Sequence, residues 1–202
     1  LVAAGHMPSG QYRGHKGDIW EGGHRVPMIV KWKDKIKAGS FSDQLVCLTD
    51  IYATCQELVS GKLPSPNEAE DSFSILDILF GKKVTSARDN IVSHSVFGEF
   101  AFRKDGWKIV YKLPEKNLGL SRGKPATVEL YNLKNDIAET NDSLAYYPEI
   151  AEMLHKELGK IVSRGTSKKG PQQSNDVRVR FDTIQEQRWA SKLDNSRRGL
   201  QQ

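Results

Sequence analysis

The chain has 202 residues, of which 38% are hydrophobic and 27% charged, the balance of a globular protein that folds in water. Its formal net charge of +5 is modest: it can steer an anionic substrate toward the protein but does not indicate nucleic-acid binding. No run approaches the roughly 20 apolar residues that cross a bilayer, so no membrane contact is expected. The first residues lack the basic flank and apolar run of a signal peptide, so the N-terminus is expected to be mature or internal.

The first notable stretch reads GHKGDIWEGGHRVPMIVKW and begins at Gly14. Its four glycines predict a loop whose backbone can turn tightly and come close to a ligand. The apolar run at 26–32 then predicts a buried strand, with Pro27 near its start, where a missing hydrogen-bond donor is tolerated.

Two helices are predicted next. The first covers residues 50–59, is capped by Thr49 or Asp50 and ends at Gly61. Its apolar residues fall on one stripe that is expected to face a core, and they are Ile51, Tyr52, Cys55, Leu58 and Val59. A polar linker at 64–71 separates it from a short helix at 74–80.

Two cysteines, Cys47 and Cys55, are eight positions apart on this segment. They are expected to be buried thiols rather than a disulfide or a metal-binding pair.

The second half predicts a small antiparallel sheet. Its strands are expected at 90–96, 99–104, 107–112 and 128–132. The pair Asp105-Gly106 is a strong hairpin signal. Alternation along 107–112 places Trp107, Ile109 and Tyr111 on the core face and the lysines outward, a pattern that favours core packing over an aromatic-basic surface for nucleic-acid bases.

A long helix is predicted from Pro148 to Gly165, with an apolar stripe that packs on the sheet. The residues after it are polar, basic and poorly periodic, and are expected to be extended or disordered. The predicted organisation is therefore an α/β part at 1–88, a sheet-plus-helix subdomain at 89–165, and a basic tail at 166–202.

Lys16 is the first candidate functional residue. It lies between Gly14 and Gly17, in a loop that can bring a backbone and an ammonium close to an oxyanion. Lysine is a compact charge with three donors and suits an anionic oxygen. On spacing alone, however, a solvated surface lysine is the simpler interpretation.

Four ordered blocks change that assessment, because together they resemble the arylsulfatase (sulfatase) family. They are RGHKGDIWEGGHRVPMIVKW, DIYAT at 50–54, the hairpin FRKDGWKIVYK, and LYNLKNDIAETNDSLAYYPEIAEML with the segment SRGTSKKGPQQSND after it. The resemblance runs from about Arg13 to Asp176. It implies an alkaline-phosphatase-like α/β fold, of which this chain would be the C-terminal part of the α/β domain plus a small antiparallel sheet subdomain with a packed helix.

The resemblance also implies an activity. Sulfatases hydrolyse sulfate esters with a formylglycine hydrate as nucleophile and a divalent cation, usually Ca²⁺, that polarises the sulfate. Lys16 matches the family lysine that binds a sulfate oxygen and neutralises charge on the leaving oxygen. Glu21, Arg25 and the glycines match positions that shape the loop. The family further implies a sulfated small molecule or saccharide as substrate and a periplasmic or secreted location.

The sequence departs from the family in one respect. Neither Cys47 nor Cys55 lies in a Cys/Ser-x-Pro-x-Arg formylglycine motif, and the acidic metal-binding pairs are absent. The chain is therefore interpreted as a truncated piece that does not turn over sulfate esters by itself, with no metal ligand of its own. A zinc site made of its scattered histidines is rejected because the ligand spacing is wrong.

Two histidines are substrate-side candidates. His94, in the first strand of the second part, lies where the family's C-terminal subdomain can reach over the pocket mouth, although a strand histidine satisfied by a neighbour fits equally well. His24, in the Glu-Gly-Gly-x-Arg block, has either a substrate-side or a structural role.

Two other functions stay open. A non-catalytic module that binds or assembles on an anionic polysaccharide would explain the missing nucleophile. A phosphatase or phosphodiesterase of the same fold is disfavoured by the glycine-lysine loop and the Glu-Gly-Gly-x-Arg block.

Overall fold

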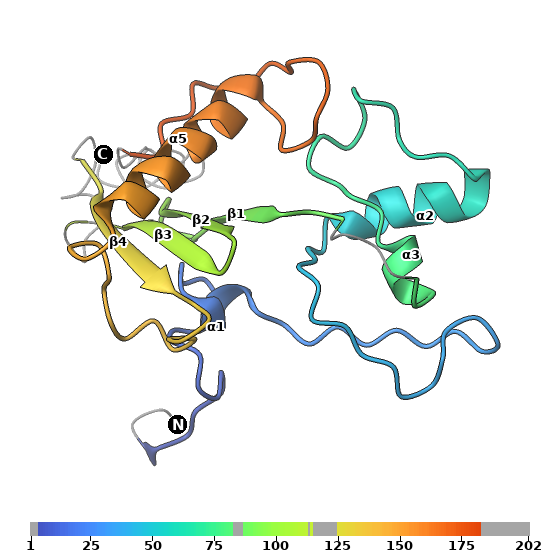
Figure 1. Cartoon of the computed structure of the whole chain (residues 1–202), viewed down its shortest axis with the longest axis horizontal. Coiled ribbons are helices and arrows are strands. Elements are labelled where there is room, and N and C mark those ends of the chain that lie inside the picture. The colour runs from blue at the N-terminus through green and yellow to red at the C-terminus, as the bar shows by residue number, and fades with distance from the viewer. Residues whose placement is uncertain (1–3, 83–86, 113, 115–124, 183–202) are drawn as a thin grey trace, which may run out of the picture. The chain divides into compact units, whose positions relative to one another are not determined.

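The computed structural model describes residues 4–82, 87–112, 114 and 125–182 (Figure 1). The chain forms two compact units, and each is assembled from separate stretches of sequence. Unit 1 comprises Leu1–Arg25, Val92–Glu152 and Val179–Gln202, and unit 2 comprises Val26–Ile91 and Met153–Arg178. The units interleave along the chain, unlike the sequential division expected at residues 88 and 165.

A four-stranded sheet dominates unit 1. The strands are β1 (Asn90–His94), β2 (Phe100–Lys104), β3 (Trp107–Lys112) and β4 (Thr127–Asn132), and they lie in that order (Figure 1). β2 pairs antiparallel with β3, and β3 with β4. Asp105 and Gly106 have φ of 52° and 84°, the left-handed conformation of a tight hairpin turn. The four predicted strands are confirmed, with ends shifted by at most two residues.

Both faces of the sheet are buried. The expected core face is confirmed by Ile109 and Tyr111, each 1% exposed. The opposite face carries a second core, made of Ile19, Ala101, Val110, Tyr131 and Leu133 with Trp20 and Ile137 against it. The prediction that the lysines of this strand point outward is therefore wrong for Lys108, which is 2% exposed. Alternation assigns residues to two faces but cannot tell whether one face or both will be covered.

Unit 2 contains α2 (Asp50–Ser60) and the short α3 (Leu76–Leu79), which contact each other. Gly61, with φ of 68°, ends α2 and donates its N–H to the carbonyl of Glu57, as its position predicts. The chain passes from unit 1 to unit 2 within α5 (Pro148–Arg164), the predicted long helix. Among the residues that the structure describes, no helix has the length and apolar character to cross a membrane.

The predicted inward stripe of α2 is wrong. Its buried residues are Asp50, Ala53 and Thr54. The apolar residues lie on the exposed side instead, where Val59 is 88% and Tyr52 57% exposed. Cys55 on the same side is also exposed, and Cys47 is half-buried; both are free thiols, so the expectation of buried thiols is not met.

Residues 26–32 form no strand, contrary to the prediction. They are exposed, and Figure 1 draws the chain from there to α2 without a strand or helix. An apolar run becomes a strand only when a neighbouring strand pairs with its backbone. Within the described part of unit 2, no strand does so.

The chain after α5 is ordered where the structure describes it. Thr166 is 2% exposed, and its hydroxyl donates a hydrogen bond to the carbonyl of Glu70. The backbone N–H of Ser167 donates to the Asp71 carboxylate. The expected disorder from residue 166 is therefore wrong at its start, because specific hydrogen bonds compensate for the poor hydrophobic pattern. Residues 183–202 of the predicted tail lie outside the described part.

Candidate functional site

The glycine-rich stretch forms a tight loop closed by one helical turn, α1 (Glu21–His24). Gly22 donates its N–H to the Arg13 carbonyl at 2.8 Å, which brings the loop back against the helix. A Cβ atom on Gly22 would lie 2.4 Å from the carbonyl oxygen of Gly14, and one on Gly23 would lie 2.2 Å from that of Asp18. Because backbone atoms occupy that space, only glycine fits at both positions, which gives the Gly-Gly pair a steric explanation.

The loop carrying Lys16 is fixed on its other side as well. Gly17, with φ of 97°, accepts a hydrogen bond from the N–H of Val96, just beyond β1. His15 is held by the Asp18 carboxylate, which accepts from its backbone N–H at 2.9 Å and pairs with its ring at 3.2 Å. Lys16 between them is exposed. The local structure therefore presents one ammonium from a backbone anchored at both ends.

A buried charge cluster lies beneath this loop. Lys108 on β3 approaches the carboxylates of Glu21 at 3.1 Å and Glu139 at 2.8 Å, and it also donates to the carbonyl of Ile19. Glu139 accepts a further bond, at 2.6 Å, from the backbone N–H of Glu21. Arg103 on β2 pairs with Glu21 at 3.1 Å. The cluster thus ties the start of α1 to two strands and to the turn after β4.

Desolvation of these charges is offset by their mutual pairing. Burial raises the pKa of Glu139, and the nearby Lys108 ammonium opposes that rise. A network of two carboxylates and two cations that is closed to water serves as a rigid support. The expectation that Glu21 and Arg25 shape the loop fits this arrangement, since Arg25 lies 4.0 Å from the same Glu21 carboxylate.

A stacked aromatic group supports the other end of the loop. The Arg13 guanidinium lies 3.5 Å from the centre of the Trp20 ring, and Trp20 packs edge-on against Tyr131. Arg13 also donates to the Tyr131 hydroxyl and to the Glu139 carbonyl. Cation–π stacking and two hydrogen bonds therefore hold the first residue of the loop on β4 and the turn after it.

The two candidate histidines come into electrostatic contact. Burial, then the Lys108 charge, then to a smaller extent His94 lower the pKa of His24, against the opposing charges of Glu21 and Asp18. The Nε2 atom of His24 is buried without a hydrogen-bond partner among the described residues. Burial also lowers the pKa of His94, although the residue remains exposed and its ring meets Phe100 at 4.4 Å. Both rings are therefore neutral at pH 7.

Sequence reasoning missed Lys108 and Glu139. Lys108 was assigned to the solvated face, and Glu139 was noted only within an acidic turn. The signal that could have identified them is a lysine flanked by apolar residues on a strand, combined with spare acidic groups in the Glu-Gly-Gly block and in that turn. Which of the available acids pairs with the lysine depends on contacts between residues 87 and 118 positions apart.

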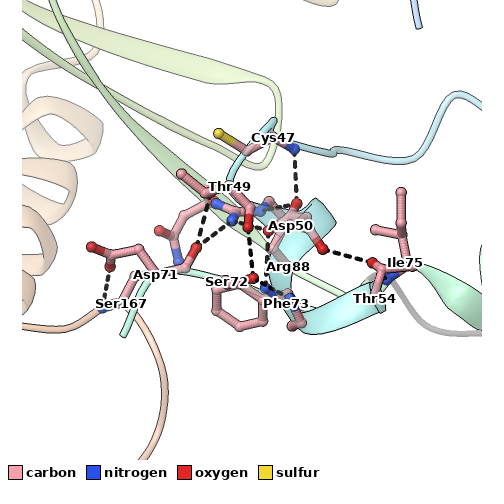
Figure 2. A network of polar contacts seen from close by, with 12 residues as sticks. Cys47, Thr49, Asp50, Thr54, Asp71, Ser72, Phe73, Ile75, Arg88 and Ser167 are labelled. Carbon is pink, nitrogen blue, oxygen red and sulfur yellow. Dashed lines mark hydrogen bonds and ion pairs between the residues drawn. The ribbon is translucent and has the colours of Figure 1, made fainter. Parts of the chain in front are cut away.

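Unit 2 has its own buried ion pair, shown in Figure 2. Asp50 is fully buried at the first turn of α2, and its carboxylate accepts two hydrogen bonds from the Arg88 guanidinium and one each from the N–H groups of Cys47 and Phe73. Asp50 therefore fixes the chain before α2 rather than capping the helix. Thr49 makes no side-chain cap, and its hydroxyl donates to the carbonyl of Asp71.

The pocket of unit 2 does not contain the predicted site residues. It has a volume of about 320 Å³ and lies beside α2 and α3, between Phe73, Leu63 and Lys168. Lys16, His24 and His94 all belong to unit 1. Among the described residues, no three His, Cys, Asp or Glu side chains are arranged to hold a metal ion, so these residues do not fit the calcium site that the resemblance implies.

Comparisons with known proteins identify the class to which this fold belongs. The chain is 32% identical over 164 residues to the N-acetylgalactosamine-6-O-sulfatase of Bacteroides thetaiotaomicron, covering 79% of this chain and 32% of that enzyme. It is 30% identical to arylsulfatase G of Rattus norvegicus, covering 73% and 31%. No family model matches the chain.

Solved structures agree. A structure from work on glycosaminoglycan metabolism by Bacteroides thetaiotaomicron superposes with a TM-score of 0.67 at 31% identity, covering 79% of this chain and 33% of that one. A sulfatase from Pseudoalteromonas sp. superposes with a TM-score of 0.60 at 29% identity, covering 81% and 34%. The chain belongs to the sulfatase family, as its motifs predicted. It spans about a third of the length of these relatives.

Proposed function

We propose that this chain is the C-terminal part of a sulfatase that hydrolyses aryl or carbohydrate sulfate esters. The formylglycine nucleophile and the calcium ligands would belong to the part of the polypeptide outside these 202 residues. Family membership supports this proposal, together with coverage of about a third of each relative. The relatives include an N-acetylgalactosamine-6-O-sulfatase, which favours a sulfated saccharide as substrate and a periplasmic or secreted location.

Lys16 would bind a sulfate oxygen. The observation that carries this role is the doubly anchored loop, in which the backbone on both sides of Lys16 is hydrogen-bonded while the side chain stays exposed. A pre-positioned ammonium can compensate negative charge that builds on the leaving oxygen without moving during the reaction. The buried Glu21–Lys108–Glu139 cluster would keep the loop in place.

His24 and His94 would lie on the substrate side of the same unit. Both are neutral at pH 7, because burial lowers the pKa of each. A neutral imidazole can donate one hydrogen bond and accept another, which suits sugar hydroxyls. The buried Nε2 of His24 without a described partner supports a ligand-binding role over a purely structural one.

The test is an assay of the complete gene product against a panel of sulfated saccharides and an aryl sulfate. Lys16→Ala should lower kcat at least about 100-fold, the effect of removing one pre-organised charge contact. Lys62→Ala is the matched control, because Lys62 is an exposed lysine of unit 2 just beyond α2. Turnover like that of the wild type in Lys16→Ala would reject the role of this lysine.

The alternative is a non-catalytic module that binds an anionic polysaccharide. It predicts that the 202-residue chain by itself binds a sulfated polysaccharide and that no formylglycine motif is encoded upstream of Leu1. The gene sequence and a binding isotherm therefore separate the two functions.

A further inference from the structure

Unit 2 exposes far more apolar side chain than a small folded unit normally does. The helix α2 turns its small and polar residues inward, where Ala53 is 1% and Thr54 7% exposed. Its apolar residues point outward, with Leu58 at 43% and Val59 at 88% exposed. Amphipathic helices pack with the opposite orientation when their partner is present. The outward face of α2, made of Ile51, Tyr52, Leu58 and Val59, therefore lacks its partner.

Residues 26–32 are unpartnered in the same way. Ile29 is 92% exposed within a run of Val, Met, Ile, Val and Trp, a composition typical of a strand buried on both faces. No backbone hydrogen bond joins residues 26–31 to another described residue. Only Trp32 is tied down, through its carbonyl and through a ring contact with Phe80 at 6.0 Å. This segment thus offers both free backbone groups and apolar side chains.

We propose that residues 26–32 and the outward face of α2 are the docking surface for the rest of the sulfatase polypeptide. Residues 26–32 would add a strand to a sheet in that part, and its helices would cover the apolar side chains. The proposal rests on the proposed function, because it takes its occupant from the missing two thirds of the relatives' length. A strand edge with helices around it is the chemistry that satisfies free backbone groups and an apolar run together.

Hydrogen exchange measured by mass spectrometry tests this directly. In the 202-residue chain alone, the amides of residues 28–31 should exchange as in an unstructured peptide. In the complete gene product they should exchange at least about 100-fold more slowly, since a paired central strand opens rarely. Val59→Lys and Ile29→Lys should remove this protection. Tyr146→Lys should not, because Tyr146 is a residue of unit 1 that is 80% exposed.

The same substitutions in the short chain guard against simple misfolding. There Ile29→Lys touches nothing, so its thermal midpoint should stay within about 2 °C of the wild type. A large loss of stability in the short chain would show that Ile29 already packs there, and would overturn the proposal. Protection of residues 28–31 in the short chain would do the same, whether sedimentation shows a monomer or a self-associated species. A gene that encodes no longer polypeptide would also overturn it.

Sulfatase activity is scored separately on the complete product. An active product with unprotected residues 28–31 would reject the docking surface and leave the proposed function standing. A protected but inactive product would retain the docking surface and reject the function.

Discussion

The ammonium of Lys108 lies 2.8 Å from the carboxylate of Glu139, and the two side chains are only 2% and 0% exposed. This pair links the middle of β3 to the turn after β4, and through Glu21 it reaches the loop that carries Lys16. The candidate site of unit 1 therefore depends on a buried ion pair that contributes no atom to its surface.

Replacing Lys108 with methionine should destabilise unit 1 strongly. The change leaves the carboxylates of Glu21 and Glu139 buried without their shared cation, at a cost of about 3–5 kcal/mol in the free energy of unfolding. Urea denaturation followed by tryptophan fluorescence measures this. Lys112→Met is the matched control on the same strand, because Lys112 is 28% exposed and pairs with Glu129 near the surface. It should cost less than about 1 kcal/mol. Equal effects would show that the buried cluster has no special role.

Alanine at Gly23 should distort the Lys16 loop. The new methyl group would lie 2.2 Å from the carbonyl oxygen of Asp18, a backbone atom that cannot swing away. Overpacking of this kind should cost about 2–3 kcal/mol. Gly39→Ala is the comparison, since it has open space and only a left-handed backbone, and should cost about 1 kcal/mol. Thermal unfolding should rank the two in this order, and the reverse ranking would contradict the steric explanation.

Replacing Asp50 with asparagine should unfold unit 2 more easily. The guanidinium of Arg88, nearly fully buried, would lose its counter-ion, and the cost should be about 3–5 kcal/mol. Asp77→Asn also removes an acid from an ion pair, but Asp77 and Lys82 are exposed, so unfolding should change little. Limited proteolysis within 26–91 reports on unit 2 specifically. Comparable cleavage rates in the two variants would argue against the role of the Asp50–Arg88 pair.

His24 should make stability fall as the solution becomes more acidic than about pH 6.5. Its pKa in the folded chain is lowered from 6.5 by burial and by Lys108, so between the two pKa values the unfolded chain binds more protons. The free energy of unfolding should therefore rise with pH through that window, by up to about 1.4 kcal/mol per pH unit. Glu139 has the opposite effect above its ordinary pKa, since its folded pKa is raised.

His24→Gln isolates the histidine contribution from that of Glu139. The difference in unfolding free energy between wild type and variant should shrink as the pH falls from 7 to 5, because only the wild type carries the protonation penalty at His24. Denaturant titrations at several pH values measure that difference. A difference that stays constant with pH would show that His24 titrates alike in the folded and unfolded chain.

The elements governed by local rules were predictable. The Asp105-Gly106 hairpin, the Gly61 end of α2 and the long helix from Pro148 all follow from turn chemistry, capping and a short-range period. The family was predictable too, because its motifs are contiguous blocks. Residues 26–32 and the apolar stripe of α2 were placed wrongly because their burial depends on neighbours that the described chain does not supply.

The sequence by itself therefore determined the family, the order of the strands and helices, and the loop in which Lys16 lies. Only the tertiary structure decided that Lys108 is buried against Glu21 and Glu139, that His24 and His94 influence each other, and that Asp50 pairs with Arg88. The physical reason is the range of the interactions. Turns and helices are set by residues a few positions apart, whereas a buried charge is stable only where distant segments bring its counter-ion.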